Sequence, residues 1–300
     1  MDMELHSLYK RIGLLLLGIF FCLMQGWAGN ALTLEAGNAV FAGIRMPYRF
    51  ARTAMGTGKP ALVIYLHGGS SKGNDNEMQM KEAGIDSIAN YLVAAQVNAL
   101  FLVPQCPADK SWGGPMLGVL KSLIERYVDE GIVDGDHVYL FGGSMGGTGT
   151  WSMLSAYPHL FAAAMPVVGN PSKCVADSVA LTPVFTVMGT ADRIMSVETA
   201  ADFITELTAK GGEARMETEE GWTHEMTCIQ SYTTPRLDWV FAHRRFPTGI
   251  VATELSASPA DQVRFYSPDG CRLPSKPTKG LYIERRRSRD GAVTTVKRMW

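Results

Sequence analysis

The chain has 300 residues, of which 46% are hydrophobic, and its formal net charge at pH 7 is −1. This apolar content is ample for a large buried core, and the composition favours a soluble enzyme with one large or two modest domains. No segment combines a basic face with interleaved aromatic residues, which excludes a nucleic-acid partner.

The first residues have the layout of a secretory signal peptide. Lys10 and Arg11 precede an apolar run over residues 12–24, and residues 26–28 offer a small-x-small cleavage site. The run is shorter than the roughly 20 residues that span a bilayer, and an uncleaved membrane anchor is the alternative. We therefore assign residues 1–28 to a signal peptide. The expected location is the periplasm, the cell surface or the medium, with no membrane association after cleavage.

Apolar runs alternate with helix-like segments along residues 33–245. Residues 38–54 begin this region as a pair of extended segments, with Pro47 tolerated on an edge. Five β-branched or apolar runs then indicate strands buried on both faces: 61–69, 97–105, 137–143, 161–169 and 183–192. Residues 113–131 and 197–212 have amphipathic helical patterns that end at glycines. The alternation predicts a doubly wound, mostly parallel α/β sheet with its site at the carboxyl ends of the strands.

The last part of the chain differs from the rest in composition and charge. Residues 246–260 are small, polar and proline-bearing, which predicts a linker. Residues 261–300 contain strand-like stretches, and Asp290 with Gly291 is a good two-residue hairpin turn. Residues 271–300 carry a local charge of +7, which leaves −8 for the remainder. We therefore expect a small, basic β appendage.

Four cysteines remain after signal removal: Cys106, Cys174, Cys228 and Cys271. An exported protein can form disulfides, and the spacing does not choose among the pairings. Cys174 with Cys228 is the favoured pair, because both are expected in loops near the same end of the sheet. That pair is favoured only if a disulfide exists, and free buried thiols are at least as strong an alternative. No CxxC sequence or cluster of His and Cys is present, so we expect no metal site.

A G-x-S-x-G sequence gives the strongest chemical signal. Gly142-Gly143-Ser144-Met145-Gly146 lies between the strand-like run before it and the helix-like run "GTWSMLSAY" after it. This is the context of a nucleophile elbow, in which a tight turn exposes the serine hydroxyl and the glycines allow close packing. We predict that Ser144 is the nucleophile and that the Met145 N–H stabilises an oxyanion.

A serine nucleophile needs a base and an acid that orients the base. In this type of sheet the order along the chain is Ser, then Asp or Glu, then His. Asp192 ends an apolar strand ahead of a helix, whereas its competitor Asp177 lies in a polar loop. His224 follows the last plausible strand and is the expected base. His137, His159 and His243 are more simply surface or capping histidines.

The segment His67-Gly68-Gly69-Ser70 follows the first central strand. We predict that the Gly69 N–H completes the oxyanion hole, with or without that of Ser70, and that His67 is structural. Trp112 and Trp222 lie in loops of the expected site, where aromatic surfaces suit a sugar or a phenolic acyl group. The alternative is that both tryptophans only pack loops.

These motifs resemble the α/β-hydrolase superfamily. The segments "MPYRF", "LVIYLHGGSSKGNDNEMQM", "LVPQCPADKSWGG", "VYLFGGSMGGTGTW", "GTADRIMSVETA" and "GWTHEM" are similar to exported esterases related to polyhydroxybutyrate depolymerases and to feruloyl or acetylxylan esterases. The resemblance spans residues 38–243 and implies ester hydrolysis without a cofactor. It carries the roles onto Ser144, Asp192, His224, Gly69 and Met145. The oxyanion loop departs from the pattern in reading His-Gly-Gly-Ser rather than a longer glycine run.

The tail separately resembles the C-terminal sorting domains of type IX secretion substrates. The carrying pattern is "DG" followed by "CRL" and "KGLYI" before a basic end. This resemblance implies secretion machinery as a partner. The tail departs from the pattern in being short and in containing three consecutive arginines.

Taken together, the residues predict a serine hydrolase that cleaves carboxylic esters through an acyl-enzyme intermediate. Acyl groups on carbohydrates or phenolic esters are the expected substrates, as small molecules or borne on polymers. A serine peptidase of the prolyl oligopeptidase type is the alternative, although the sequence has no propeller or long insert to gate peptides. A non-catalytic binding protein ranks third.

Overall fold

A computed structural model describes residues 32–53, 55–245, 262–267, 272–273, 275–277, 281–287 and 293–299. The chain divides into two units, Met1–Arg244 and Arg245–Trp300. The predicted signal peptide, the linker and the hairpin turn at Asp290 and Gly291 lie outside the described residues. Among the residues described, no helix is both long and apolar enough to cross a membrane.

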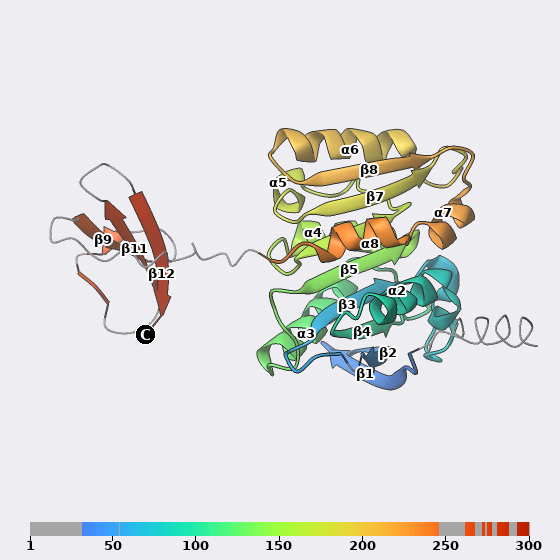
Figure 1. Ribbon diagram of the computed structural model, residues 1–300, viewed down its shortest axis with the longest axis horizontal. Coiled ribbons are helices and arrows are strands. Elements are labelled where there is room, and N and C mark those ends of the chain that lie inside the picture. Colours follow the sequence, from blue (N-terminus) through green and yellow to red (C-terminus); the bar gives the residue numbers. More distant parts are fainter. Residues whose placement is uncertain are drawn as a thin grey trace, which may run out of the picture. The chain divides into compact units, whose positions relative to one another are not determined.

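An eight-stranded sheet runs through the first unit in the order β1-β2-β4-β3-β5-β6-β7-β8 (Figure 1). The strands β1 and β2 are antiparallel to their neighbours, and every pair from β4 to β8 is parallel. Their bounds are β1 (Glu35–Phe41), β2 (Ile44–Arg52), β3 (Ala61–Leu66), β4 (Ala99–Pro104), β5 (Val138–Gly143), β6 (Ala163–Val167), β7 (Val184–Gly189) and β8 (Ala214–Glu219). The prediction of a doubly wound, mostly parallel α/β sheet is confirmed.

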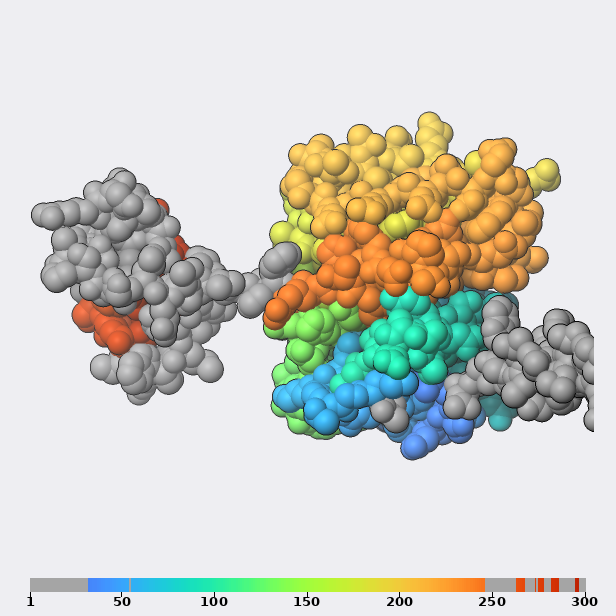
Figure 2. Space-filling view, in the orientation of Figure 1, coloured from blue at the N-terminus to red at the C-terminus, as the bar shows by residue number. Residues whose placement is uncertain are grey.

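Helices cover both faces of this sheet. Their bounds are η1 (Gly69–Ser71), η2 (Met78–Lys81), α2 (Ala83–Ala94), α3 (Pro115–Asp129), α4 (Met145–Ala156), α5 (Ala176–Val179), α6 (Val197–Ala209), α7 (His224–Gln230) and α8 (Thr234–Phe241). Figure 2 shows α2 in teal and α8 in orange side by side on one face, and α3 and α4 pack in the core of the other face.

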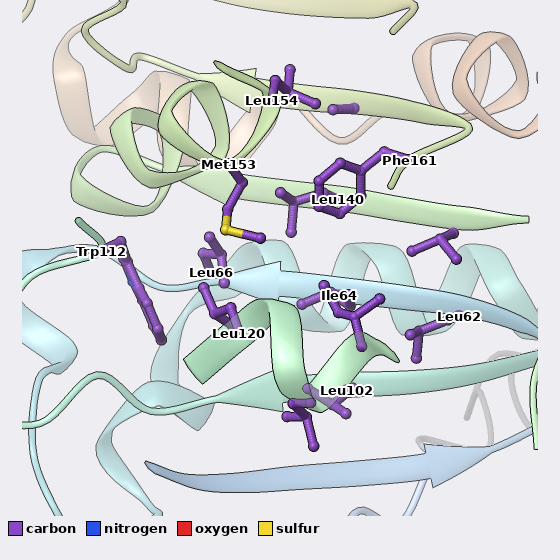
Figure 3. Close-up of a cluster of buried hydrophobic side chains, with 14 of the residues drawn as sticks. Leu62, Ile64, Leu66, Leu102, Trp112, Leu120, Leu140, Met153, Leu154 and Phe161 are labelled. Carbon is purple, nitrogen blue, oxygen red and sulfur yellow. The ribbon is translucent and has the colours of Figure 1, made fainter. Parts of the chain in front are cut away.

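The strands supply side chains to the two faces in turn. On β3, Leu62, Ile64 and Leu66 join the core under α3 and α4, which Figure 3 shows in close-up. Val63 and Tyr65 of the same strand join the core under α2 and α8. All five side chains are fully buried, because a parallel strand between helical layers has no solvent face.

Both amphipathic helices predicted from the sequence are present. Gly131 and Gly211 follow α3 and α6 with φ of +68° and +79°, a conformation that glycine adopts without a steric penalty. At the start of α6, the Ser196 side chain accepts a hydrogen bond from the Thr199 N–H. These helix ends are therefore encoded locally.

The position expected for Pro47 needs a correction. Pro47 lies on β2, which is an internal strand between β1 and β4, so β1 forms the edge instead. The proline is tolerated because pairing of β2 with β4 begins only at Tyr48. Its carbonyl oxygen still accepts a hydrogen bond from the Gln105 N–H at 2.8 Å.

The second unit is a small antiparallel sheet of four strands in the order β10-β9-β11-β12. The strands are β9 (Gln262–Tyr266), β10 (Arg272–Leu273), β11 (Leu281–Arg287) and β12 (Val293–Met299). Tyr282 is buried and meets the ring of Phe265 edge-on at 5.9 Å. A small C-terminal β appendage is thus present, as predicted.

Candidate active site

Ser144 lies in the tight turn between β5 and α4. Its φ is +57°, in a region that residues with a side chain rarely adopt. A Cβ built on Gly146 would lie 1.8 Å from the Leu66 carbonyl oxygen, and one on Gly142 would lie 2.5 Å from the Gly146 carbonyl oxygen. Only glycine fits at these two positions, which is the physical reason for the glycines that surround the serine.

The end of β6 supports this turn from the other side. The Ser144 N–H donates to the Val167 carbonyl oxygen at 3.0 Å, and the Val168 N–H donates to Val187 at 3.1 Å. Val168 has a φ of +40°, which is unusual for a β-branched residue and stores backbone strain. Sequence reasoning missed this feature, because no residue pattern marks a valine in the left-handed region.

Two hydrogen bonds connect Ser144 to His224 and Asp192. His224 Nε2 lies 2.8 Å from Ser144 Oγ, and His224 Nδ1 lies 2.8 Å from Asp192 Oδ2. A carboxylate only accepts hydrogen bonds, so Nδ1 carries the ring proton and Nε2 is the acceptor for the serine hydroxyl. This arrangement prepares Nε2 to take the proton of Ser144.

The loops that carry Asp192 and His224 pack directly on each other. Asp192 follows β7, His224 begins α7, and the Ala191 N–H donates to the Trp222 carbonyl oxygen at 3.1 Å. A Cβ on Gly189 would come within 2.2 Å of that same oxygen, so the approach requires glycine.

The carboxylate of Asp192 is fixed in place and shielded from water. Its side chain has no exposed surface, and its Oδ1 accepts the N–H groups of Ile194 at 2.7 Å and Met195 at 2.9 Å. These bonds hold the second oxygen, Oδ2, toward His224. The imidazole is therefore oriented by a carboxylate that cannot rotate freely.

The competing residues lie elsewhere. Asp177 binds the Lys210 ammonium at 2.8 Å on the surface, and His137 binds Asp134 at 2.8 Å. His137 and His159 precede β5 and β6, which places them at the opposite end of the sheet from Ser144. His243 lies beyond α8, where Nε2 approaches Glu213 at 3.2 Å. The structure thus brings together the three residues that the sequence favoured.

The expected oxyanion donors lie beside the serine. A Cβ built on Gly68 would be 3.7 Å from the Ser144 Cβ, so the loop that continues into Gly69 and Ser70 passes next to Ser144 at Gly68. Gly69 and Met145 are the first residues of η1 and α4, positions whose N–H groups have no partner within their helix. Across the described segments, neither N–H donates to another backbone or side-chain group. Both are available to a substrate oxygen.

His67 is completely buried next to this loop. Its Nε2 lies 2.9 Å from the Cys106 N–H, and its Nδ1 lies 2.7 Å from the Gly68 carbonyl oxygen. Because the Cys106 N–H needs an acceptor, the ring proton is on Nδ1 and is donated to Gly68. Burial lowers the pKa of His67 to about 4, so the ring is neutral. The contacts fit the structural role expected for this histidine.

The two tryptophans occupy different environments. Trp112 is only 2% exposed, its indole N–H donates to the His67 carbonyl oxygen at 3.0 Å, and Figure 3 shows it at the edge of the buried cluster. Burial leaves Trp112 no surface for a substrate, so its position favours the packing alternative. Trp222 is half-buried two residues before His224, with the Arg236 guanidinium 6.0 Å above its ring.

Arg236 and Glu82 are two supporting residues that sequence reasoning missed. Arg236 is buried and contacts Glu217 and Glu219 of β8, which ties α8 to the strand leading to His224. Glu82 accepts the Gly68 N–H at 3.1 Å and the Ser71 hydroxyl at 2.6 Å. Neither residue has a recognisable motif, since each lies far along the chain from its contacts.

The favoured disulfide between Cys174 and Cys228 is not formed. Cys106, Cys174 and Cys228 are free, and Cys271 lies outside the described residues. Cys174 packs against the core under α3 and α4, whereas Cys228 packs against the core on the other face of the sheet. The prediction was wrong because Cys174 lies in the loop before α5 on one face of the sheet, whereas Cys228 lies on α7 and packs on the other face. Among the described residues, no group of three or more His, Cys, Asp or Glu side chains could hold a metal ion.

The strand order and the turn at Ser144 together define the α/β-hydrolase fold. Comparison with solved structures gives the same class: its neighbours are esterases, a dienelactone hydrolase and peptidases of the α/β-hydrolase superfamily. No model of a protein family matches the sequence. No curated protein matches it either.

Three solved structures illustrate the range of neighbours. A thermostable esterase is 26% identical over 72% of this chain and 64% of its own, with a TM-score of 0.63. A puromycin-hydrolysing peptidase of Mycobacterium tuberculosis is 15% identical over 69% of this chain and 40% of its own, with a TM-score of 0.55. A protein of Klebsiella pneumoniae assigned as a dienelactone hydrolase is 17% identical over 70% of this chain and 96% of its own, with a TM-score of 0.51. The chain thus spans less than two thirds of the esterase and less than half of the peptidase.

Proposed function

We propose that the protein is a serine hydrolase that cleaves carboxylic esters, with Ser144 as nucleophile, His224 as general base and Asp192 as its orienting acid. The observation that carries the proposal is the pair of 2.8 Å hydrogen bonds running from Ser144 Oγ through His224 to Asp192. This geometry meets the requirement that nucleophile, base and orienting group lie within hydrogen-bond reach of each other.

The reaction proceeds in two acyl-transfer steps. His224 Nε2 takes the proton of Ser144 as its oxygen attacks the ester carbonyl, and Asp192 stabilises the resulting imidazolium. The N–H groups of Gly69 and Met145 stabilise the oxyanion, and the imidazolium then protonates the departing alcohol. Water attacks the acyl-enzyme with the same base and regenerates Ser144.

An ester is the preferred substrate over a peptide. The esterase is the neighbour with the highest identity of the three described, and the peptidase neighbour has more than half of its length outside the matched part. The specific observation in favour of a peptidase is that several neighbours, such as an acylaminoacyl peptidase of Pyrococcus horikoshii, have that activity. Peptide hydrolysis is therefore the second candidate function.

Carbohydrate-borne or phenolic acyl groups are the substrate class we propose. Trp222 is half-buried beside His224, and its aromatic surface suits a sugar or phenolic ring. The loop between β6 and β7 contains only the four-residue α5, a short connection that favours an open site for bulky esters. Replacing Trp222 with alanine is expected to raise KM for aromatic or glycosidic esters and to leave simple acetate esters unaffected.

Export remains a proposal that rests on the sequence of residues 1–28 and on the resemblance of the tail to a sorting domain. N-terminal sequencing of the protein recovered from its native host tests the cleavage. A mature chain that begins near residue 29 supports export, and an intact N-terminus contradicts removal of a signal peptide.

The decisive experiment is labelling of the purified protein with a fluorophosphonate, followed by peptide mapping. We expect modification at Ser144, hydrolysis of p-nitrophenyl acetate, and loss of both in Ser144→Ala with an unchanged circular dichroism spectrum. A panel of acetylated sugars, feruloyl esters and peptides then ranks the two candidate functions. Ester hydrolysis that persists in a clean Ser144→Ala preparation contradicts the assignment.

A further inference from the structure

The peptide group between His67 and Gly68 is held at both ends. The indole N–H of Trp112 donates to the His67 carbonyl oxygen at 3.0 Å, and the Gly68 N–H donates to Glu82 Oε1 at 3.1 Å. Since both groups of this peptide have partners, the chain leaves β3 with its first peptide plane fixed.

The next peptide group, between Gly68 and Gly69, is held at only one end. Its carbonyl oxygen accepts the Nδ1–H of His67 at 2.7 Å. The described residues contain no cis peptide bond, and in a planar trans peptide the N–H points opposite to the C=O. The Gly69 N–H is therefore directed away from the imidazole, and it is the group without a protein partner.

The imidazole itself cannot turn. Its Nε2 accepts the Cys106 N–H at 2.9 Å, and the Trp112 ring meets it edge-on with 5.2 Å between ring centroids. Gly68 and Gly69 have no side chains that restrict backbone rotation. Apart from this ring, the second peptide plane is held by the Ser71 N–H alone, which donates to the same Gly68 carbonyl oxygen at the longer distance of 3.3 Å.

We propose that His67 is a positioning residue whose Nδ1–H fixes the Gly68–Gly69 peptide so that the Gly69 N–H faces the oxyanion formed at Ser144. The proposal rests on the proposed function, in which Gly69 is an oxyanion donor. Trp112 and Cys106 act indirectly, because they hold the His67 imidazole in its orientation. A preorganised donor is worth more in the transition state than one that must reorient, which gives the arrangement its catalytic value.

Two substitutions separate this role from simple packing. His67→Asn places an amide nitrogen near the position of Nδ1, so it keeps a donor for the Gly68 carbonyl and loses the acceptor for Cys106. His67→Gln reaches the position of Nε2, so it keeps the acceptor and loses the donor. His137→Asn and His137→Gln are the matched controls, because His137 lies at the opposite end of β5 from Ser144.

We expect kcat for p-nitrophenyl acetate to fall about 10- to 100-fold in His67→Gln, with KM within about twofold of wild type. Complete loss of one oxyanion donor costs roughly 10²–10³ in kcat, and a misaligned donor costs part of that. His67→Asn should retain kcat within about threefold, and both His137 variants should match wild type. Equal losses in the two His67 variants, in proportion to their loss of thermal stability, overturn the proposal.

A readout that does not depend on the ester keeps the proposal separate from the proposed function. The ¹⁵N and ¹H shifts and the hydrogen-exchange rate of the Gly69 amide report its orientation in each variant. We expect these to change in His67→Gln and to stay near wild type in His67→Asn, even if the wild-type protein is neither labelled by fluorophosphonate nor active on esters. Unlabelled wild type refutes the proposed function, whereas a Gly69 amide unchanged in His67→Gln refutes the positioning role.

Discussion

Acidification should destabilise the protein because it protonates His67, and the loss in the free energy of unfolding follows from the burial of this side chain. Burial lowers the pKa of His67 to about 4 in the folded protein, whereas a histidine in the unfolded chain titrates near 6.5. Between these values the unfolded state binds more protons than the folded state, so the free energy of unfolding rises with pH. The stability is fully present above about pH 6.5 and is lost as the pH falls toward 4.

The expected loss is about 2 kcal/mol at pH 5 relative to pH 7.5, and it approaches about 3 kcal/mol near pH 4. Because charging His67 places an unsolvated cation against Cys106 and Trp112, the cost arises in the folded state alone. His67 alone accounts for this loss of stability. Carboxylates such as Asp75, whose pKa is lowered by the Glu77 N–H, also lower the free energy of unfolding as the pH falls.

Urea unfolding of wild type and His67→Asn at pH 7.5, 6, 5 and 4.5 isolates the effect. Subtracting the two curves removes the carboxylates, which are common to both proteins, and leaves the contribution of the imidazole. The difference in free energy of unfolding should shrink by about 2 kcal/mol from pH 7.5 to pH 5. A pH-independent difference, or an NMR titration of His67 near pH 6.5, refutes the reasoning.

Two further predictions concern the nucleophile turn and the triad. Gly146→Ala should cost at least about 2 kcal/mol of stability by denaturant unfolding, with loss of esterase activity, because the added Cβ meets the Leu66 carbonyl at 1.8 Å. Gly118→Ala is its control, since only Phe41 lies within contact at 3.7 Å, and an equal loss there contradicts the steric argument. Asp192→Asn should lower kcat about 10³- to 10⁴-fold, whereas Asp177→Asn should leave kcat within about twofold. Steady-state kinetics with p-nitrophenyl acetate would contradict the triad if the two variants behaved alike.

The centre of the sheet could be predicted because strands β3 to β7 are buried on both faces. A strand such as β3 appears in the sequence as an unbroken apolar run, which is recognisable without knowledge of its neighbours. Gly131 and Gly211 mark the ends of the two amphipathic helices. The placement of Pro47 failed, because whether a strand lies at an edge depends on its partners along the sheet. That information is non-local and absent from the segment itself.

Some residues of the candidate site carry a local sequence signal and could be predicted, whereas others carry none. Ser144 lies in a local motif, and Asp192 and His224 follow apolar runs, so chain order and position after a strand were enough to predict three side chains that the fold brings within hydrogen-bond distance. Trp112 was misjudged, because a tryptophan in a loop has the same local appearance whether its ring faces solvent or a core. Glu82 gave no signal at all, since its contact with Gly68 depends on how residues 69–81 fold.

The close approach of the Gly146 and Leu66 backbones fixes the loop after β3 relative to the turn that carries Ser144. Leu66 is the last residue of β3 and leads into the loop of Gly68 and Gly69, while Gly146 lies two residues after Ser144, the proposed nucleophile. The attack distance is therefore defined where two elements of the scaffold touch, below the surface loops. The loop of residues 170–175, which follows β6, can be exchanged or lengthened without altering that distance. Such a chain is suited to engineering in which substrate preference changes while the chemistry is kept.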